Sequence, residues 1–225
     1  MTENRPPDSA VLLDVDGTLV DTNWIHTVAW ARALRRCGRL VAMHRIHPLV
    51  GMGADLLVEE LVGEEVPGAS EAHHDEYEAL RPDVRLLPGA RELIRAVHGL
   101  GLAVVLASSS KEDELDFLRT LLDAEDWLSA ATSSGDAEVS KPAPDIFAAA
   151  LDRVGVAPER AIVVGDTVWD VQAADRAGLS TVGLLTGGTR GIELLGAGAV
   201  EVHEDPAALC RALAGSAIAR LASTG

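Results

Sequence analysis

Four strongly apolar runs constrain the fold of this chain more than any other feature of its sequence. They cover residues 10–15, 102–107, 161–166 and 180–185. A strand with one solvated face alternates apolar and polar residues, whereas each of these runs is apolar at consecutive positions. The pattern therefore predicts parallel strands covered by helices on both faces. The segment at 199–204 (AVEVHE) predicts one more short strand.

Helical patterns separate these runs. They cover 89–99, 111–122, 144–154 and 168–177, and Gly178 follows the last of them. Proline near a helix start and glycine after its end are the usual boundary signals. The alternation predicts an α/β protein whose core is a Rossmann-like, doubly wound parallel sheet, with a final Ala/Leu-rich helix covering the sheet.

The segment from 21 to 87 breaks this alternation. It contains helix-like stretches at 24–37, 53–62 and 69–80 and no convincing strand. This predicts an all-helical cap inserted after the first strand, so that residues 1–20 and 88–225 form the Rossmann-like core. Pro82 and Pro88 bracket a short extended linker, which is the expected position of a hinge.

Charge and hydropathy exclude several classes of protein. Lys and Arg total 19 against 35 Asp and Glu, which gives a net charge of −16, and a chain of this charge without a basic run is not expected to bind nucleic acid. The apolar runs are far shorter than the roughly 20 residues of a transmembrane helix, so no membrane span is expected. The polar start of the sequence lacks the pattern of a secretion signal, so a cytoplasmic location is expected. Cys37 and Cys210 stand alone, which argues against a zinc knot or a disulfide scaffold.

Acidic residues lie at the carboxyl ends of two of the apolar runs. Asp14 and Asp16 leave the first strand on the same side, and Asp166 and Asp170 lie at the corresponding place after the third run. The carboxyl ends of strands in an open α/β sheet form the usual ligand site. Because neighbouring carboxylates repel each other and oxygen-only donors suit Mg²⁺, the pattern predicts a magnesium site. Thr18 is expected to offer its hydroxyl and its N–H to an anionic substrate.

Hydroxyl and ammonium groups lie close to the other predicted strand ends and helix starts. Ser108, Ser109 and Ser110 end the second run just before a predicted helix, and Lys141 precedes the helix at 144–154. Hydroxyl groups at a helix N-terminus favour phosphate, and the sequence has only one other lysine, Lys111. We therefore expect a phosphorylated ligand here.

Taken together, these segments resemble the haloacid dehalogenase-like hydrolase superfamily, and in particular its helical-cap members such as phosphoglycolate phosphatase and β-phosphoglucomutase. The segment at 14–22 (DVDGTLVDT) is similar to the first of the family's four motifs. Ser108, Lys141 and the segment at 165–170 (GDTVWD) match the second, third and fourth. The predicted insertion also falls where the helical cap of this family falls, so the resemblance covers nearly the whole chain.

The resemblance implies a mechanism for each acidic residue. Asp14 would be the nucleophile that forms an aspartyl-phosphate, and Asp16 would be the general acid and later the base. Asp14, Asp166 and the main-chain carbonyl of Asp16 would bind Mg²⁺, with Asp170 as a further ligand or as the residue that orients one.

The resemblance also implies residues that contact the substrate. Ser108 and Lys141 would bind the phosphoryl oxygens, with Ser109 beside them. His26 has the spacing of a histidine that couples cap closure to the acid–base aspartate in the mutases; the alternative is a half-exposed histidine at the start of a cap helix. The predicted activity is Mg²⁺-dependent hydrolysis of a small phosphorylated metabolite, such as a sugar phosphate or phosphoglycolate, by a monomer or homodimer.

Other activities remain open at this point. Dehalogenases of the family lack an aspartate at the position of Asp16, which favours phosphoryl transfer. A β-phosphoglucomutase needs an arginine in the cap loop, where this chain has Ala54, and an amide where it has Glu112. A simple phosphatase is therefore preferred to a mutase. A non-enzymatic phospho-acceptor, like a response-regulator receiver, is disfavoured because a receiver has no such insertion.

Several further residues have less specific interpretations. Asp21 and Thr22 are expected to cap the first cap helix. His73 and His74 are expected to face solvent, as are the acids Glu112, Asp113 and Glu114 at a helix start. Trp24 either lines the substrate entrance or anchors the cap helix, and the HxxH spacing of His44 and His47 is not expected to bind metal.

Overall fold

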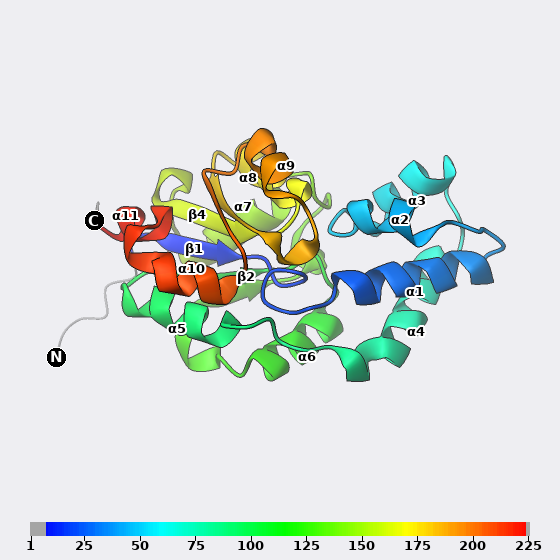
Figure 1. Cartoon of the computed structure of the whole chain (residues 1–225), viewed down its shortest axis with the longest axis horizontal. Coiled ribbons are helices and arrows are strands. Elements are labelled where there is room, and N and C mark those ends of the chain that lie inside the picture. Colours follow the sequence, from blue (N-terminus) through cyan, green and yellow to red (C-terminus); the bar gives the residue numbers. More distant parts are fainter. Residues whose placement is uncertain (1–7, 224–225) are drawn as a thin grey trace.

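A parallel sheet forms the centre of the computed structural model, which describes residues 8–223 (Figure 1). The sheet has six strands in the order β3-β2-β1-β4-β5-β6, all parallel. The strands are β1 (Ala10–Leu13), β2 (Ala103–Ala107), β3 (Ala130–Thr132), β4 (Ala161–Gly165), β5 (Ser180–Leu184) and β6 (Glu201–His203). The predicted α/β class is therefore confirmed.

Helices cover both faces of the sheet, which explains why its strands are apolar at consecutive positions. Along β1, Val11 and Leu13 pack into one buried cluster, whereas Ala10 and Leu12 pack into another on the opposite face. The first cluster includes residues of α5 (Ala90–Gly99), α6 (Glu112–Leu122), α10 (Pro206–Ala212) and α11 (Ala217–Ala222). The second includes residues of α7 (Asp145–Val154) and α8 (Val168–Arg176), and α9 (Gly191–Ala197) packs beside α8.

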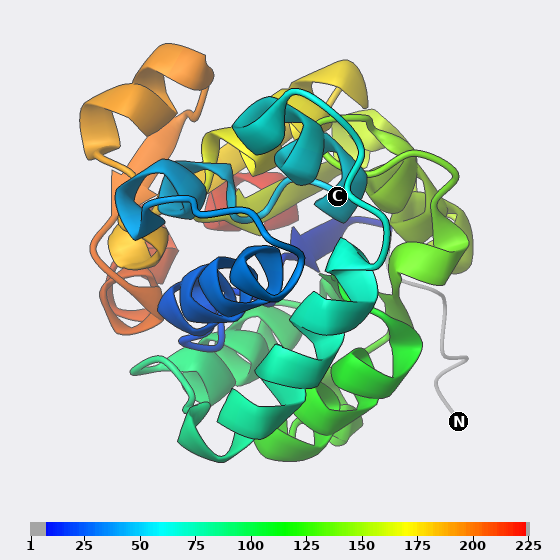
Figure 2. The same cartoon turned by 90° about the vertical axis from the view of Figure 1, so that its right-hand side faces the viewer.

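The elements between β1 and α5 form a separate helical layer beside the carboxyl ends of the strands (Figures 1 and 2). They are α1 (Asn23–Arg36), α2 (Met43–Ile46), α3 (Ala54–Val62), α4 (Ala69–Leu80) and short turns. These helices have their own apolar core, which includes Trp30, Leu34, Ile46, Leu57 and Leu61. We call residues 21–87 the helical insertion.

Two short elements, β3 and α2, were not predicted from the sequence. β3 has three residues and lies at an edge of the sheet, and α2 has four, so neither is long enough to show a period. α9 was also not expected. The predicted final helix is divided into α10 and α11, because Ser216 begins a new helix and its hydroxyl accepts a hydrogen bond from the Ala219 N–H at 3.4 Å.

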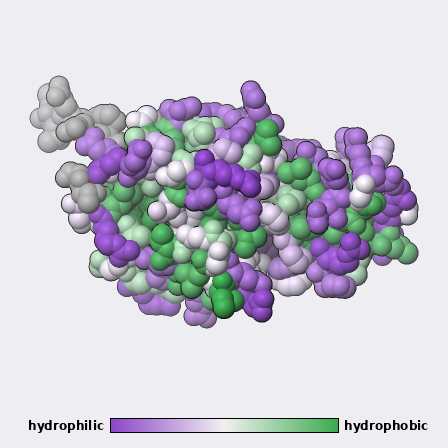
Figure 3. Space-filling model, turned by 90° about the horizontal axis from the view of Figure 1, so that it is seen from above, coloured by the Kyte–Doolittle hydropathy of each residue, from purple (hydrophilic) through white to green (hydrophobic). Residues whose placement is uncertain are grey.

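Polar residues are interspersed with small apolar areas on the face of the molecule in Figure 3. The large exposed apolar side chains, such as Leu40, Ile192 and Trp24, come from separate segments. Single exposed apolar residues of this kind are normal for a folded domain. Among residues 8–223, no helix has the length and apolar character needed to cross a membrane.

Candidate active site

The loops that follow β1, β2 and β4 meet at one edge of the sheet because β1 lies between the other two strands. The Asp14 N–H continues the ladder by donating to the Val164 carbonyl at 3.0 Å. A cavity of about 400 Å³ lies between this edge and the helical insertion. Its lining includes Asp14, Asp16, Ser109, Lys141 and Asp170 from the core side.

Asp14 and Asp170 share a buried lysine. The Lys141 Nζ lies 2.5 Å from Asp14 Oδ1 and 2.7 Å from Asp170 Oδ1, and all three side chains are almost fully buried. The other oxygen of Asp170, Oδ2, accepts hydrogen bonds from the Thr167 N–H and hydroxyl and so caps α8. Lys141 and the start of α8 thus fix the orientation of Asp170.

Asp166 completes a group of three carboxylates. Its Oδ1 accepts a hydrogen bond from the Thr18 hydroxyl, and its Oδ2 accepts one from the Asn23 amide, each at 2.7 Å. Oxygen atoms of Asp14, Asp166 and Asp170 all lie within 4.8 Å of one another. An all-oxygen, carboxylate-rich donor set is the kind that Mg²⁺ prefers, so these residues fit that ion.

Burial of this cluster changes the acidity of its members. Burial raises the pKa of Asp14 to about 7 even though Lys141 opposes the rise, and the charge of Asp170 raises it further. Burial and the charges of Asp170 and Asp14 raise the pKa of Asp166 well above its ordinary value. Burial alone would lower the pKa of Lys141, but the two carboxylates beside it raise it. The single lysine does not offset three carboxylates, so the cluster favours an additional cation.

Gly17 allows the loop after β1 to approach Asp166. Its φ is 77°, in the left-handed region, and a Cβ at this position would lie 2.4 Å from both the Asn23 amide and Asp166 Oδ2. A larger residue would be strained and would displace both side chains. The glycine in the first motif is therefore required by backbone conformation and by space.

Asp16 does not belong to the group of three carboxylates and instead lies beside His26 and Glu114. Its Oδ1 accepts a hydrogen bond from the Thr22 hydroxyl at 2.7 Å, and its Oδ2 accepts one from the Ser110 hydroxyl at 2.8 Å. Burial opposes ionisation of Asp16, but the contacts with His26, Thr22 and Ser110 together lower its pKa to about 2. The Asp16 carboxylate is thus held in its charged form, separate from the candidate magnesium ligands.

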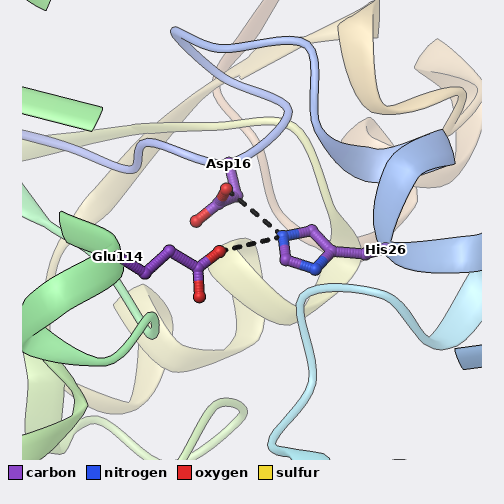
Figure 4. Close-up of side chains that lie close together, drawn as sticks. All are labelled: Asp16, His26 and Glu114. Carbon is purple, nitrogen blue, oxygen red and sulfur yellow. Dashed lines mark hydrogen bonds and ion pairs between the residues drawn. The ribbon is translucent and has the colours of Figure 1, made fainter. Parts of the chain in front are cut away.

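His26 joins the helical insertion to the core. Its Nε2 lies 3.4 Å from Asp16 Oδ1 and 3.6 Å from Glu114 Oε1, as Figure 4 shows. Burial lowers the pKa of His26, but the two carboxylates outweigh this effect and raise it. Burial and the charge of Asp16 raise the pKa of Glu114 to about 7, against the lowering effect of His26.

The predicted phosphate-binding serines lie in different environments. Ser108 is fully buried; its hydroxyl accepts from the Ser110 N–H at 3.0 Å and lies 3.4 Å from Asp16 Oδ2. Ser109 and Ser110 line the cavity together with Lys111. The second motif therefore reaches the cavity through the two residues after Ser108.

Two expectations about the first motif are corrected. The Thr18 hydroxyl donates to Asp166, and its N–H donates to the Val15 carbonyl at 3.3 Å, so neither group is offered to a substrate. Thr22 occupies the N-cap position of α1, but its side chain makes no cap hydrogen bond and donates to Asp16 instead. Thr18 binds a carboxylate that the loop after β4 brings close, and Thr22 binds one six residues earlier in its own loop.

Two expectations about the surroundings of the cavity are also corrected. Glu114 is buried rather than solvated, and His73 lines the cavity, where it stacks on Trp30 with ring centroids 4.2 Å apart. Trp24 is 57% exposed and stacks on His47 rather than lining the cavity. Within the described residues, the groups with metal-ligand spacing include neither His44 nor His47.

Several residues of the site were missed in the sequence. Asn23 binds Asp166, Tyr77 stacks on His26 with ring centroids 4.6 Å apart, and the Thr186 hydroxyl donates to the Gly17 carbonyl at 2.5 Å. Thr186 follows β5, so its place after a predicted strand was the one signal that pointed to it. Asn23 and Tyr77 lie on helices of the insertion, and their contacts depend on tertiary packing.

Comparison with known proteins identifies the family. A model of the haloacid dehalogenase-like hydrolases matches residues 9–178. A phosphorylated carbohydrates phosphatase of Thermotoga maritima is 29% identical over 85% of this chain and 92% of that protein. A probable pseudouridine-5'-phosphatase of Drosophila melanogaster is 32% identical over 76% and 79%, and a phosphoglycolate phosphatase of Salmonella typhi is 28% identical over 79% and 81%.

Solved structures are similar over the whole fold. A hydrolase from Pseudomonas syringae matches with a TM-score of 0.86 and 33% identity, over 92% of this chain and 98% of that one. A putative β-phosphoglucomutase from Thermotoga maritima matches with a TM-score of 0.69 and 26% identity, over 92% and 99%. The family model, these relatives and the residues at the strand ends agree, and the chain belongs to the haloacid dehalogenase-like hydrolase family.

Proposed function

We propose that this protein is a Mg²⁺-dependent phosphatase that hydrolyses a small phosphate monoester through an aspartyl-phosphate on Asp14. One observation carries the proposal: Asp14 lies in the cavity wall, with Lys141 and two further carboxylates on one side and Asp16 nearby. The names of the relatives, which are phosphatases of phosphorylated small molecules, agree with this activity.

Asp14, Asp166 and Asp170 are the residues that would hold the magnesium ion, together with the main-chain carbonyl of Asp16. The raised pKa values of Asp14 and Asp166 and the insufficient charge of Lys141 support a cation at this place. When bound, Mg²⁺ would supply positive charge that offsets the negative charge of the phosphoryl oxygens.

Asp14 would begin the reaction by attacking phosphorus with a carboxylate oxygen. As the new oxygen–phosphorus bond forms, the bond to the leaving oxygen breaks, and Asp16 donates a proton to that oxygen. Asp16 then accepts a proton from a water molecule that attacks the phosphoryl group, which releases phosphate and restores the Asp14 carboxylate. Lys141 would stabilise the charge on the transferring group, and Ser109 would bind its oxygens.

The low pKa of Asp16 suits the second half of this reaction. In the free protein Asp16 is ionised, as a base must be, because the contact with His26 and the hydrogen bonds from Thr22 and Ser110 lower its pKa. A bound phosphate monoester would place negative charge near Asp16 and raise its pKa, which favours the protonated form that the first step needs. The substrate itself would thus prepare Asp16 to act as an acid.

The cavity fits a phosphatase better than a mutase. A mutase must bind a second phosphate, yet the described residues that line the cavity include no arginine, and Ala54 lies at the cap-loop position. The size of the cavity, about 400 Å³, suits a small phosphorylated metabolite, such as a sugar phosphate or phosphoglycolate.

The helical insertion, residues 21–87, would act as a cap over this cavity. Its two connections to the core run side by side, because Leu87 N–H donates to the Leu19 carbonyl at 3.0 Å and Asp21 N–H to the Arg85 carbonyl at 2.9 Å. Two adjacent linkers allow the cap to move as a unit. Closure would remove bulk water from the substrate, and opening would release the products.

A metal-dependent activity assay tests the proposal. The protein is incubated with a panel of phosphorylated metabolites and p-nitrophenyl phosphate, with Mg²⁺ or with a chelator, and free phosphate is measured. We expect Mg²⁺-dependent turnover that Asp14→Asn abolishes and that Asp175→Asn, an exposed aspartate of α8, leaves unchanged. Turnover by Asp14→Asn at the parent rate, or no turnover of any monoester, would contradict the proposal.

A further inference from the structure

Glu114 is a buried acid whose place needs an explanation. It lies in the first turn of α6, is only 7% exposed, and lines the cavity. Its Oε1 has no hydrogen-bond partner and lies 3.6 Å from the His26 Nε2, while the Tyr77 and Ser110 hydroxyls also lie near the carboxylate. Burying a carboxylate costs free energy unless a cation or donor compensates it, so the role of Glu114 is to be sought at His26.

A general helix effect does not account for this burial. Acids in the first turn of a helix are stabilised by its dipole, but Glu112 and Asp113 occupy the same turn and are exposed. They interact with the dipole without losing their hydration. Burial of Glu114 therefore points to a specific contact.

His26 has neighbours at one face of its ring and at both ring nitrogens. One face of its ring stacks on Tyr77, with an interplanar angle of 7°, and its Nδ1 lies 3.3 Å from the His73 Nε2. These contacts come from the helical insertion. They leave the Nε2 edge of the ring pointing at two carboxylates of the core, Asp16 and Glu114, which flank it in Figure 4.

Asp16 by itself provides a weak anchor for His26. Its closest partners are the Thr22 and Ser110 hydroxyls at 2.7 and 2.8 Å, whereas His26 is 3.4 Å away. Glu114 makes no competing hydrogen bond through Oε1, so this oxygen is available to the imidazole, which is the ionisable group that it contacts within ion-pair distance. A single Nε2–H shared between the two carboxylates keeps the ring beside Asp16 without binding it tightly.

We infer that Glu114 is a positioning residue for the acid–base step: through His26, it holds the helical insertion and the imidazole in register with Asp16. The inference rests on the proposed function, because Asp16 acts as an acid and a base only in that reaction. Since Glu114 belongs to the core and His26 to the insertion, their contact forms only when the two parts are correctly placed around the cavity.

Kinetics on two substrates test the inference. Glu114→Gln keeps the shape of the side chain and removes its charge. We expect this change to lower kcat/KM roughly tenfold for an alkyl phosphate, whose leaving oxygen needs a proton, and by less than about threefold for p-nitrophenyl phosphate, whose leaving group does not. Asp116→Asn, which alters an exposed acid of the same helix, serves as the control and leaves both values unchanged.

A double-mutant cycle separates positioning from general damage. In a His26→Asn background, Glu114→Gln is expected to cause no further loss, because the residue through which it acts is gone. Glu114→Asp, a second variant, keeps the charge and should retain part of the alkyl phosphate activity. Equal losses on both substrates, or an undiminished loss in the His26→Asn background, would overturn the inference.

Assays of the unmutated parent protein distinguish a failure of this inference from a failure of the proposed function. If the parent shows no hydrolysis that depends on Asp14, both fall together. If the parent is active and the Glu114 variants behave like Asp116→Asn, only the inference falls.

Discussion

Lys141 and Asp14 form a buried ion pair, with Nζ and Oδ1 2.5 Å apart, although 127 positions separate them in the sequence. The lysine also contacts Asp170 at 2.7 Å. Within the described residues, Lys141 is therefore the cation that contacts both Asp14, directly after β1, and Asp170, in the first turn of α8. Its removal would leave both acids uncompensated in a buried site.

Lys141→Gln is accordingly expected to lower both activity and stability. We expect a loss of roughly 10² to 10³-fold in kcat, because the transferring phosphoryl group loses a fixed positive charge. Without Mg²⁺, the free energy of unfolding should fall by about 3–5 kcal/mol, and saturating Mg²⁺ should restore part of it. Urea denaturation with and without Mg²⁺ measures the second effect; a stability loss that is unaffected by Mg²⁺ would count against the shared-cation account.

Thr18 and Asn23 are predicted to control Mg²⁺ affinity through Asp166. Each donates a hydrogen bond to one oxygen of that carboxylate. Thr18→Val should therefore raise the dissociation constant for Mg²⁺ by roughly 10 to 100-fold while kcat at saturating Mg²⁺ changes little. Isothermal titration calorimetry measures this, and Thr27→Val, which removes a buried hydroxyl one turn along α1, is the control. Equal affinities of the two variants would refute the assignment.

Gly187 lies against the same carboxylate and tolerates no side chain. A Cβ at this position would lie 1.8 Å from Asp166 Oδ2, so Gly187→Ala must displace Asp166 or the loop after β5. We expect weakened Mg²⁺ binding and a lower melting temperature. Gly196→Ala in α9, where a Cβ meets nothing within 4 Å, should be neutral or slightly stabilising. Identical melting temperatures and Mg²⁺ affinities for the two variants would contradict this prediction.

Glu114 is expected to make the stability of the protein depend on pH. Its pKa in the folded state is about 7, above the unfolded value, so its contribution is complete in acid and is lost as the pH rises through about 7. Glu114→Gln stays neutral and avoids this loss. Relative to the parent, the variant should gain on the order of 1–3 kcal/mol in the free energy of unfolding between pH 5 and pH 8. Urea denaturation at both pH values checks this; a difference that is the same at both would be inconsistent with a carboxyl group that ionises in this range.

The sequence predicted those parts of the site that lie at the ends of long, buried strands. Asp14, Asp16 and Asp166 lie at the ends of apolar runs whose helical cover could be inferred, and the short distance between Asp14 and Asp166 is a consequence of parallel strand order. Lys141 was found through its motif and its rarity in the chain. In each case, a local pattern fixed the position of the side chain at the edge of the sheet.

The sequence did not predict contacts that cross between the insertion and the core. Thr18 turns to Asp166 because Gly17 has a positive φ, and His73 and Tyr77 surround His26 because of how α1 packs on α4. Glu114 did carry a signal, since it lies four residues before Leu118 on the buried stripe of α6. Its place in a run of acids obscured that signal.

Chemical trapping tests the central claim, that Asp14 becomes phosphorylated during turnover, most directly. The protein is mixed with Mg²⁺ and its best substrate, quenched in acid during turnover, digested and analysed by peptide mass spectrometry. We predict that the peptide containing Asp14 gains the mass of one phosphoryl group, which is lost on incubation at alkaline pH, and that Asp14→Asn shows no gain. A substrate turned over at full rate with no phosphoryl group on this peptide, or with the group on another residue, would contradict the account.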